Sequence, residues 1–218
     1  MTRAVVGGSW SVMIALVLTA ACRHGSAWAE EAVVAPADPE STPAIAAAAI
    51  VGGDDVVVRV SQGPQGIEVE GRCFVDAPAT AAWSVLTDYD GIGKFVSSIR
   101  ESRVSRDGDG HILVDQVAVG HVFLFSRQFR VTLRVDEEPL GRIRFEDILK
   151  HDFVSYRGEW QIEGSGSRIE LVYRVSAQPA FSVPGFIARG LFKRTVRELL
   201  GQVREEIVRR ATLAEQLR

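Results

Sequence analysis

The sequence predicts an α+β fold in which a curved antiparallel sheet wraps around one long C-terminal helix. Strand-like segments follow one another through the second half of the chain, and the Pro184-Gly185 step then opens an amphipathic helix that runs to the C-terminus. A short helix carrying residues 83–90 precedes most of the strands. Because a sheet closed over one helix encloses a hollow, we expect a hydrophobic cavity.

Length and charge suit one domain with extensions. The chain has 218 residues and a formal net charge of −3. Nucleic-acid-binding domains usually carry a basic surface, and this near balance gives no sign of one. We therefore expect no nucleic-acid partner.

Residues 1–29 have the pattern of a secretory signal peptide. Arg3 is followed by an apolar run over residues 12–21 and by Ala27-Trp28-Ala29, a small-x-small cleavage site. The run is shorter than the roughly 20 residues of a transmembrane helix. Loss of residues 1–29 removes two arginines and no acid, which changes the formal charge from −3 to −5.

A second interpretation of the same segment is lipidation. Thr19-Ala20-Ala21-Cys22 resembles a bacterial lipobox, in which the cysteine becomes the lipidated first residue. Both interpretations predict export, either as a periplasmic protein or as a lipoprotein anchored through Cys22. Residues 30–53 are rich in alanine, proline and acids and predict a disordered tether. The ligand-binding domain is predicted to span residues 54–214.

The first ordered element is a predicted hairpin over residues 56–60 and 67–75. Its second strand places hydrophobic residues on one face and charged residues on the other. Cys73 lies on the apolar face, where a small buried hydrophobe is a simpler interpretation than a reactive thiol. A helix is then expected to begin with Asp76 as its cap and Pro78 in its first turn, and to end at Gly91 and Gly93.

Six further strands are predicted. Their ranges are 99–106, 112–119, 122–136, 141–149, 153–163 and 168–177. Asp107-Gly108-Asp109-Gly110 separates the first two and resembles part of a calcium loop, but it lacks the length and the terminal glutamate, so a plain turn is expected.

Alternation gives these strands one apolar face. In the strand 153–163 the predicted inward residues are Val154, Tyr156, Gly158, Trp160 and Ile162. The final helix should cover this face with a stripe of apolar residues at helical spacing: Phe192, Val196, Leu199, Val203 and Ile207.

One charged pair is possible inside the cavity. Alternation places Arg127 on the apolar face of the strand 122–136, and Asp147 on the apolar face of the strand 141–149. A buried cation needs a partner, so the two could pair, either to hold a ligand or to brace the sheet. The alternatives are a bulge that turns Arg127 to solvent and a strand-end position at the cavity mouth.

No metal or cofactor site is expected. His111, His121 and His151 stand singly with no acid grouped beside them. The sequence has no Gly-x-Ser-x-Gly, phosphate-loop or dinucleotide motif. An enzyme would depend on general acid–base catalysis by Asp115, Asp147 or Tyr173.

Several segments together resemble the START-like, helix-grip (SRPBCC) superfamily, and within it the polyketide cyclase/dehydrase and coenzyme Q-binding group. The resemblance covers about residues 55–213 and rests on residues 77–90, Phe95-Val96, 102–104, 158–160, 173–175 and 179–184. It implies a cavity between the sheet and the long helix, used without cofactor or metal.

The resemblance implies non-enzymatic binding or transport of a lipid, quinone or isoprenoid-like ligand, or alternatively an aromatase/cyclase acting on a polyketide-like substrate. An exported protein favours a lipid-like ligand. The residues expected to line the cavity are Trp83, Tyr89, Phe95, Phe123, Phe125, Arg127, Phe129, Phe145, Asp147, Trp160, Tyr173, Phe186 and Leu191. Tyr89 could instead be a packing ring, and Trp83, Trp160 and Tyr173 could be core.

The outer face of the final helix is basic. Residues 189–210 contain seven basic and three acidic residues. This pattern is typical of a solvated face, or of peripheral contact with an anionic membrane. Phe181, Phe186 and Ile187 would then lie near the cavity mouth.

Overall fold

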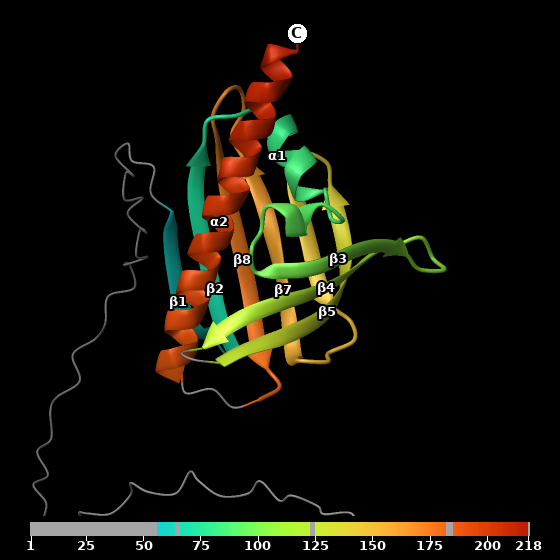
Figure 1. Cartoon of the computed structure of the whole chain (residues 1–218), viewed down its shortest axis with the longest axis vertical. Coiled ribbons are helices and arrows are strands. Elements are labelled where there is room, and N and C mark those ends of the chain that lie inside the picture. Colours follow the sequence, from blue (N-terminus) through green and yellow to red (C-terminus); the bar gives the residue numbers. More distant parts are fainter. Residues whose placement is uncertain (1–55, 64–65, 123–124, 182–184, 218) are drawn as a thin grey trace, which may run out of the picture. The chain divides into compact units, whose positions relative to one another are not determined.

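The computed structural model describes residues 56–63, 66–122, 125–181 and 185–217 (Figure 1). The predicted signal peptide and tether lie outside these residues. So do the side chains of Phe123, Phe125, Phe186 and Ile187.

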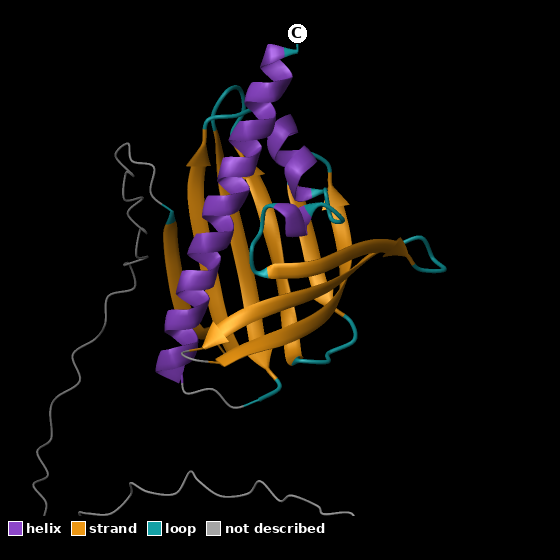
Figure 2. Ribbon diagram, in the orientation of Figure 1, coloured by secondary structure: helices purple, strands orange, loops and turns teal. Residues whose placement is uncertain are grey.

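Eight strands of the described chain form one antiparallel sheet with the order β1-β2-β8-β7-β6-β5-β4-β3. Figure 2 shows the long helix α2 lying across the sheet, with β3, β4 and β5 curling towards the same side. This arrangement confirms the predicted α+β fold. The strands are β1 (Val57–Gly63), β2 (Gly66–Val75), β3 (Ile99–Arg106), β4 (Ile112–Val122), β5 (Phe125–Glu138), β6 (Arg142–Asp147), β7 (Phe153–Glu163) and β8 (Ile169–Pro179). The helices are α1 (Ala79–Leu86), the short 3-10 helix η1 (Ile92–Lys94) and α2 (Gly185–Gln216).

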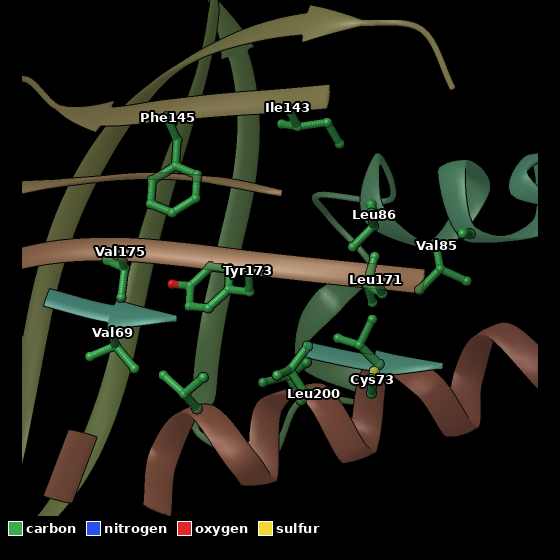
Figure 3. Close-up of a cluster of buried hydrophobic side chains, with 14 of the residues drawn as sticks. Val69, Cys73, Val85, Leu86, Ile143, Phe145, Leu171, Tyr173, Val175 and Leu200 are labelled. Atoms are coloured by element: carbon green, nitrogen blue, oxygen red, sulfur yellow. The ribbon is translucent and has the colours of Figure 1, made fainter. Parts of the chain in front are cut away.

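The sheet face that is turned towards α2, called here the inner face, carries the core. Along β2, Val69, Cys73 and Val75 are between 1% and 3% exposed, whereas Glu70, Arg72 and Phe74, which alternate with the buried residues, are more exposed. In β8, Leu171 and Tyr173 lie on the same face, close to Leu200 of α2 (Figure 3). The predicted alternation of these two strands is confirmed.

One residue of β7 lies on the opposite face from the predicted one. Val154 was expected to point inward but is 51% exposed, whereas Phe153 is 8% exposed. The pairing of β7 with β8 shifts between Phe153 and Ser155. Because of this irregularity, Phe153 points inward and Val154 points outward, the reverse of the prediction. Beyond it, Tyr156, Gly158, Trp160 and Ile162 keep their predicted face.

The predicted helix cap at Asp76 is wrong. Helix α1 begins at Ala79, and its cap position is held by Pro78, which has an extended backbone and makes no side-chain cap hydrogen bond. Asp76 lies two residues too early to reach the first free amides of the helix. Its carboxylate pairs instead with Arg168, at 3.6 Å.

Helix α2 packs against β1, β2 and α1. The predicted apolar stripe is confirmed, because Val196, Val203 and Ile207 are 3% exposed or less and Phe192 and Leu199 are partly buried. Leu200, which is fully buried, adds to it. Gly71 of β2 lies directly under Val196 and Leu200. The missing side chain of Gly71 allows α2 to approach the sheet closely.

An ion-pair group fastens α2 to α1. The guanidinium of Arg210 donates to Asp88 Oδ2 at 2.6 Å, to Glu206 Oε1 at 2.7 Å and to the carbonyl of Ser84 at 3.2 Å. Glu206 is 8% exposed and also accepts two hydrogen bonds from Arg209. The hydrogen bonds from Arg209, followed by those from Arg210, lower the pKa of Glu206 to about 2.

This depressed pKa predicts an acid-sensitive contribution to stability. Because the folded-state pKa of Glu206 lies below its ordinary value of 4.5, its contribution is complete above pH 4.5 and is lost as the pH falls towards 2. Glu206→Gln is expected to reduce the free energy of unfolding by about 1–3 kcal/mol at neutral pH and by less than half as much at pH 3. Urea unfolding of both proteins at the two pH values measures this. An equal difference at both pH values would contradict it.

Cys73 is expected to be unreactive in the folded protein. It is 3% exposed, and burial raises the pKa of its thiol to about 11. In a Cys22→Ser variant, a thiol reagent at mildly alkaline pH should therefore label Cys73 slowly, and quickly once denaturant is added. Fast labelling of the folded protein would show that the face of β2 under α2 opens readily.

Candidate functional site

A continuous line of aromatic rings runs across the inner face of the sheet. It joins side chains from β5, β6, β7 and β8 to Phe181, which follows β8 in the sequence. Neighbouring ring centroids are between 4.4 and 6.1 Å apart, which is the range of favourable aromatic contacts. In order, the rings are Phe181, Phe129, Phe153, Tyr156, Phe145, Tyr173 and Trp160.

Glycines make room for these rings. Phe145 of β6 pairs with Gly158 of β7, and a Cβ atom at Gly158 would lie only 2.6 Å from Phe145 Cζ. In the same way, a Cβ atom at Gly120 would lie 2.7 Å from Phe129 Cε2. The rings of Phe145 and Phe129 therefore lie against positions that have no side chain.

Several of these rings are not fully buried. Phe145, Phe153 and Tyr173 are between 4% and 8% exposed. Phe129, Tyr156 and Trp160 pack against the same core but keep part of their surface accessible. Phe129, Tyr156 and Trp160 therefore present apolar surface that a ligand could cover.

The aromatic line contains a pair of hydroxyl groups. The hydroxyl oxygens of Tyr156 and Tyr173 are 3.3 Å apart. Burial is the largest cause that raises the pKa of both side chains. Both tyrosines therefore stay protonated at neutral pH and act as hydrogen-bond donors and acceptors.

Asp147 points to the inner face at the end of β6 and is 1% exposed. Its Oδ1 atom accepts hydrogen bonds from the backbone N–H of Thr132 at 3.1 Å and of Leu149 at 3.3 Å. Its Oδ2 atom has no partner in the described part of the chain. One oxygen thus closes the end of the β5–β6 pairing, and the other remains available.

The possible pair between Arg127 and Asp147 does not form. Arg127 donates instead to Asp152 Oδ1 at 3.3 Å, and its guanidinium lies 4.0 Å from the centroid of Phe181. Asp147 pairs across the sheet with Leu133, six residues along β5 from Arg127. Six residues of strand span about 20 Å, too far for contact. Arg127 lies near the start of β5, in agreement with the strand-end alternative.

Other predicted cavity residues lie apart from the aromatic line. Trp83 lies in α1, and Tyr89 and Phe95 lie in the segments next to α1 and η1; all three are partly buried against the core. The Tyr89 hydroxyl donates to Glu137 Oε1 at 2.5 Å, and burial raises its pKa. Phe95 contacts the guanidinium of Arg210. Leu191 is partly buried on α2.

Asp115, suggested by sequence as a catalytic group, lies outside the interior. It is exposed, accepts a hydrogen bond from the Thr132 hydroxyl at 2.6 Å, and lines a surface hollow of about 290 Å³.

Phe153 was missed as a site residue because the β7 irregularity hid its direction, and Phe181 was expected near the mouth. Tyr156 could have been found, since alternation already placed it inward.

The expectation that no acid is grouped with His111 is wrong. Asp107, Asp109 and His111 place possible ligand atoms within 4.8 Å of one another in the turn between β3 and β4. Asp107 accepts hydrogen bonds from the backbone N–H groups of Asp109 and His111, at 3.0 and 2.9 Å. These bonds close the turn and account for the grouping. His151 is exposed, and the side chain of His121 lies outside the described residues.

A groove of about 920 Å³ lies on the opposite, outer face of the sheet. Its floor includes one row of alternating charge across six strands, in which each residue pairs with the next: Arg59, Glu70, Arg174, Glu159, Arg144 and Asp136. Arg174 bridges Glu70 at 2.8 Å and Glu159 at 2.9 Å. The charged residues that line the groove are balanced in sign apart from His111. Cross-strand pairing explains this surface without a ligand.

Comparisons with solved structures support the same architecture. Human STARD10 has 14% sequence identity and a TM-score of 0.59, with 76% of this chain and 74% of that chain covered. A STAR-related lipid transfer protein from Xanthomonas axonopodis has 17% identity and a TM-score of 0.55, with 72% and 96% covered. The Zhui aromatase/cyclase from Streptomyces sp. R1128 has 18% identity and a TM-score of 0.55, with 71% and 96% covered. At these identities the likeness concerns the fold.

A search of curated protein sequences found no significant match. A family model described as "Polyketide cyclase / dehydrase and lipid transport" matches residues 75–204, which is more than half of the chain. The match includes α1, strands β3 to β8 with the aromatic line, and α2 as far as Arg204. The chain therefore belongs to the polyketide cyclase/dehydrase and lipid transport family of the START-like superfamily.

Proposed function

We propose that the protein binds or transports a hydrophobic ligand, such as a lipid, a quinone or an isoprenoid, between the inner face of the sheet and α2, without catalysing a reaction. The aromatic line carries this proposal, because its rings are inward-facing and Phe129, Tyr156 and Trp160 keep accessible surface. Covering that surface is favourable by about 25 cal/mol per Å² of apolar area. The family match and the lipid-transfer relative support a ligand-binding interior.

Native mass spectrometry and organic extraction of the protein purified from its own host test this proposal. A hydrophobic molecule should accompany the folded protein and be released on denaturation. Purified protein that carries no such molecule, and that binds no neutral apolar dye, would overturn the proposal.

An aromatase/cyclase activity is the second candidate. Asp147 favours it, since its buried Oδ2 atom has no partner among the described residues and lies beside two tyrosines, where it could act on a bound substrate as a base. Asp147→Asn separates the two functions. A carrier should keep most of its affinity for apolar molecules, whereas an enzyme should lose turnover while still binding its substrate.

The proposed location is the periplasm, reached by cleavage after Ala29 or by lipidation of Cys22. This part of the proposal rests on the sequence of residues 1–29. The mass of the mature protein distinguishes the two routes, because cleavage gives a chain that starts at Glu30 and lipidation gives a heavier chain that starts at Cys22. No helix in the described residues is both long and apolar enough to cross a membrane.

We further propose that the first half of α2 contacts anionic membranes. Arg189, Lys193 and Arg197 are exposed, follow one another at a spacing of four, and have no partner within the described residues. The remaining bases of this helix are already engaged with other groups: Arg194, Arg204, Arg209 and Arg210. A row of free positive charge attracts anionic head groups with about 1 kcal/mol per residue.

Liposome flotation tests this contact. The protein should bind anionic vesicles at low salt and release them at high salt, and charge reversal at Arg189, Lys193 and Arg197 should abolish binding. Reversal of Arg100, Arg103 and Arg134, which are exposed elsewhere on the sheet, provides the control and should have a smaller effect. Equal binding to neutral and anionic vesicles, or equal loss in both variants, would contradict a specific docking face.

A further inference from the structure

Three polar side chains meet within the otherwise apolar inner face. Glu146 of β6 pairs with Arg157 of β7, so the next position of the same register sets Asp147 beside Tyr156. The Tyr156 hydroxyl reaches that of Tyr173 at 3.3 Å. The Asp147 charge also contributes to the raised pKa of Tyr156, which agrees with this proximity. We call Asp147, Tyr156 and Tyr173 the polar cluster.

The polar cluster has one hydrogen-bond donor and one hydrogen-bond acceptor that no described residue uses. Two tyrosine hydroxyls carry two hydrogens, and their mutual bond uses one of them. The other hydrogen has no acceptor within the described chain. Asp147 Oδ1 is occupied by two backbone amides, whereas Oδ2 is buried and has no partner there. The cluster thus offers one donor and one acceptor, and leaving such groups unmatched is costly.

We propose that the polar cluster recognises an uncharged hydroxyl group at the inner end of the ligand, so that the ligand is a hydrophobic alcohol. The ligand hydroxyl donates to Asp147 Oδ2 and accepts the free hydrogen of the tyrosine pair. This inference rests on the proposed function and names the class of ligand within it.

Other end groups match the cluster less well. A carbonyl or an ether accepts the tyrosine hydrogen but leaves Asp147 Oδ2 without a donor. An ammonium donates to Asp147 but gives the tyrosine hydrogen no acceptor. A carboxylate would be buried beside the carboxylate of Asp147, which repels it. Arg127 could not neutralise it, because Arg127 lies about 20 Å from Asp147 along β5 and is paired with Asp152. Among the end groups compared, the hydroxyl satisfies both available groups.

A matched series of ligands tests the proposal. Hexadecanol, its methyl ether, hexadecanoic acid and hexadecylamine share one chain and differ at the end group. Each is titrated against Nile red bound to the full-length protein. The alcohol should bind about tenfold more tightly than the ether, which corresponds to one net hydrogen bond. The acid and the amine should bind more weakly than the alcohol.

Variants assign this preference to the cluster. Asp147→Asn should reduce the preference for alcohol over ether to about threefold or less, with little change in affinity for the ether, because only the alcohol donates to Oδ2. Tyr156→Phe and Tyr173→Phe should each weaken the binding of alcohol and ether alike, by about threefold or more, because both ligands accept the tyrosine hydrogen. Tyr89→Phe is the matched control, because its hydroxyl bonds Glu137 away from the aromatic line. It should keep the full preference.

The outcomes separate this inference from the function on which it rests. Equal binding of alcohol and ether by the wild-type protein, or tightest binding of the acid or the amine, overturns the inference and leaves hydrophobic ligand binding intact. A wild-type preference that survives in Asp147→Asn also overturns it, and so does an unchanged affinity for both alcohol and ether in the two tyrosine variants. Failure of the protein to bind Nile red and every member of the series overturns the proposed function together with this inference.

Discussion

Gly71→Ala is expected to reduce the free energy of unfolding by about 2–3 kcal/mol, because it overfills the contact between β2 and α2. A Cβ atom at this position would overlap Leu200 Cδ1 and lie 2.9 Å from Val196 Cγ1. Both neighbours are buried, at 0% and 3% exposure, and cannot turn to solvent. Relief requires α2 to move away from the sheet, which weakens the cover over the inner face.

Gly201→Ala provides the matched control for this prediction. Gly201 lies in α2 one residue after Leu200, and a Cβ atom there would meet nothing within 4 Å. Alanine is favoured over glycine in a helix by about 1 kcal/mol, so this variant should be as stable as the wild type or more stable. Urea unfolding of the two variants measures both effects. Equal changes in stability would show that Gly71 does not set the distance between helix and sheet.

Gly158→Ala is expected to reduce both stability and ligand affinity. A Cβ atom at Gly158 would overlap the backbone oxygen of Arg174 on the paired strand and lie 2.6 Å from Phe145 Cζ. Phe145 contacts both Tyr156 and Tyr173, so a displaced ring disturbs the middle of the aromatic line. We expect a loss of about 1–3 kcal/mol in unfolding free energy and at least a tenfold weaker affinity for Nile red.

Near-ultraviolet circular dichroism and Nile red titration test the Gly158 prediction. The aromatic signal should change in Gly158→Ala and not in Gly108→Ala, a turn position where a Cβ atom would meet nothing within 4 Å. An unchanged affinity for the dye in a folded Gly158→Ala protein would mean that Phe145 does not shape the binding surface.

The positions of the strands, and the sheet face on which their side chains lie, could be predicted from the sequence wherever polar and apolar residues alternate regularly. The range predicted for β3 agrees with the structure, as does that for β7. In β8 the sequence placed Leu171 and Tyr173 inward because a regular strand turns alternate residues to one side. The stripe on α2 was similarly visible, since the helical period directs Val196, Val203 and Ile207 to one face.

Features that depend on local irregularity or on relative strand position could not be predicted. The shift between Phe153 and Ser155 leaves no clear mark in the sequence, yet it decides that Phe153 rather than Val154 joins the aromatic line. Alternation predicts that the side chains of Arg127 and Asp147 both lie on the inward face of their strands. Alternation within a strand does not reveal how far β6 is shifted along β5. This shift places Asp147 opposite Leu133 and so separates the two charges.

The most direct test of an interior ligand site uses Trp160, the end of the aromatic line, as a reporter. In a variant with Trp10, Trp28 and Trp83 replaced by phenylalanine, a brominated hydrophobic alcohol should quench Trp160 fluorescence and saturate at one equivalent. In the matched variant that retains Trp83 of α1 instead, quenching should be weaker. Strong quenching of Trp83 with none of Trp160, or no saturable quenching of either residue, would contradict ligand binding along the inner face.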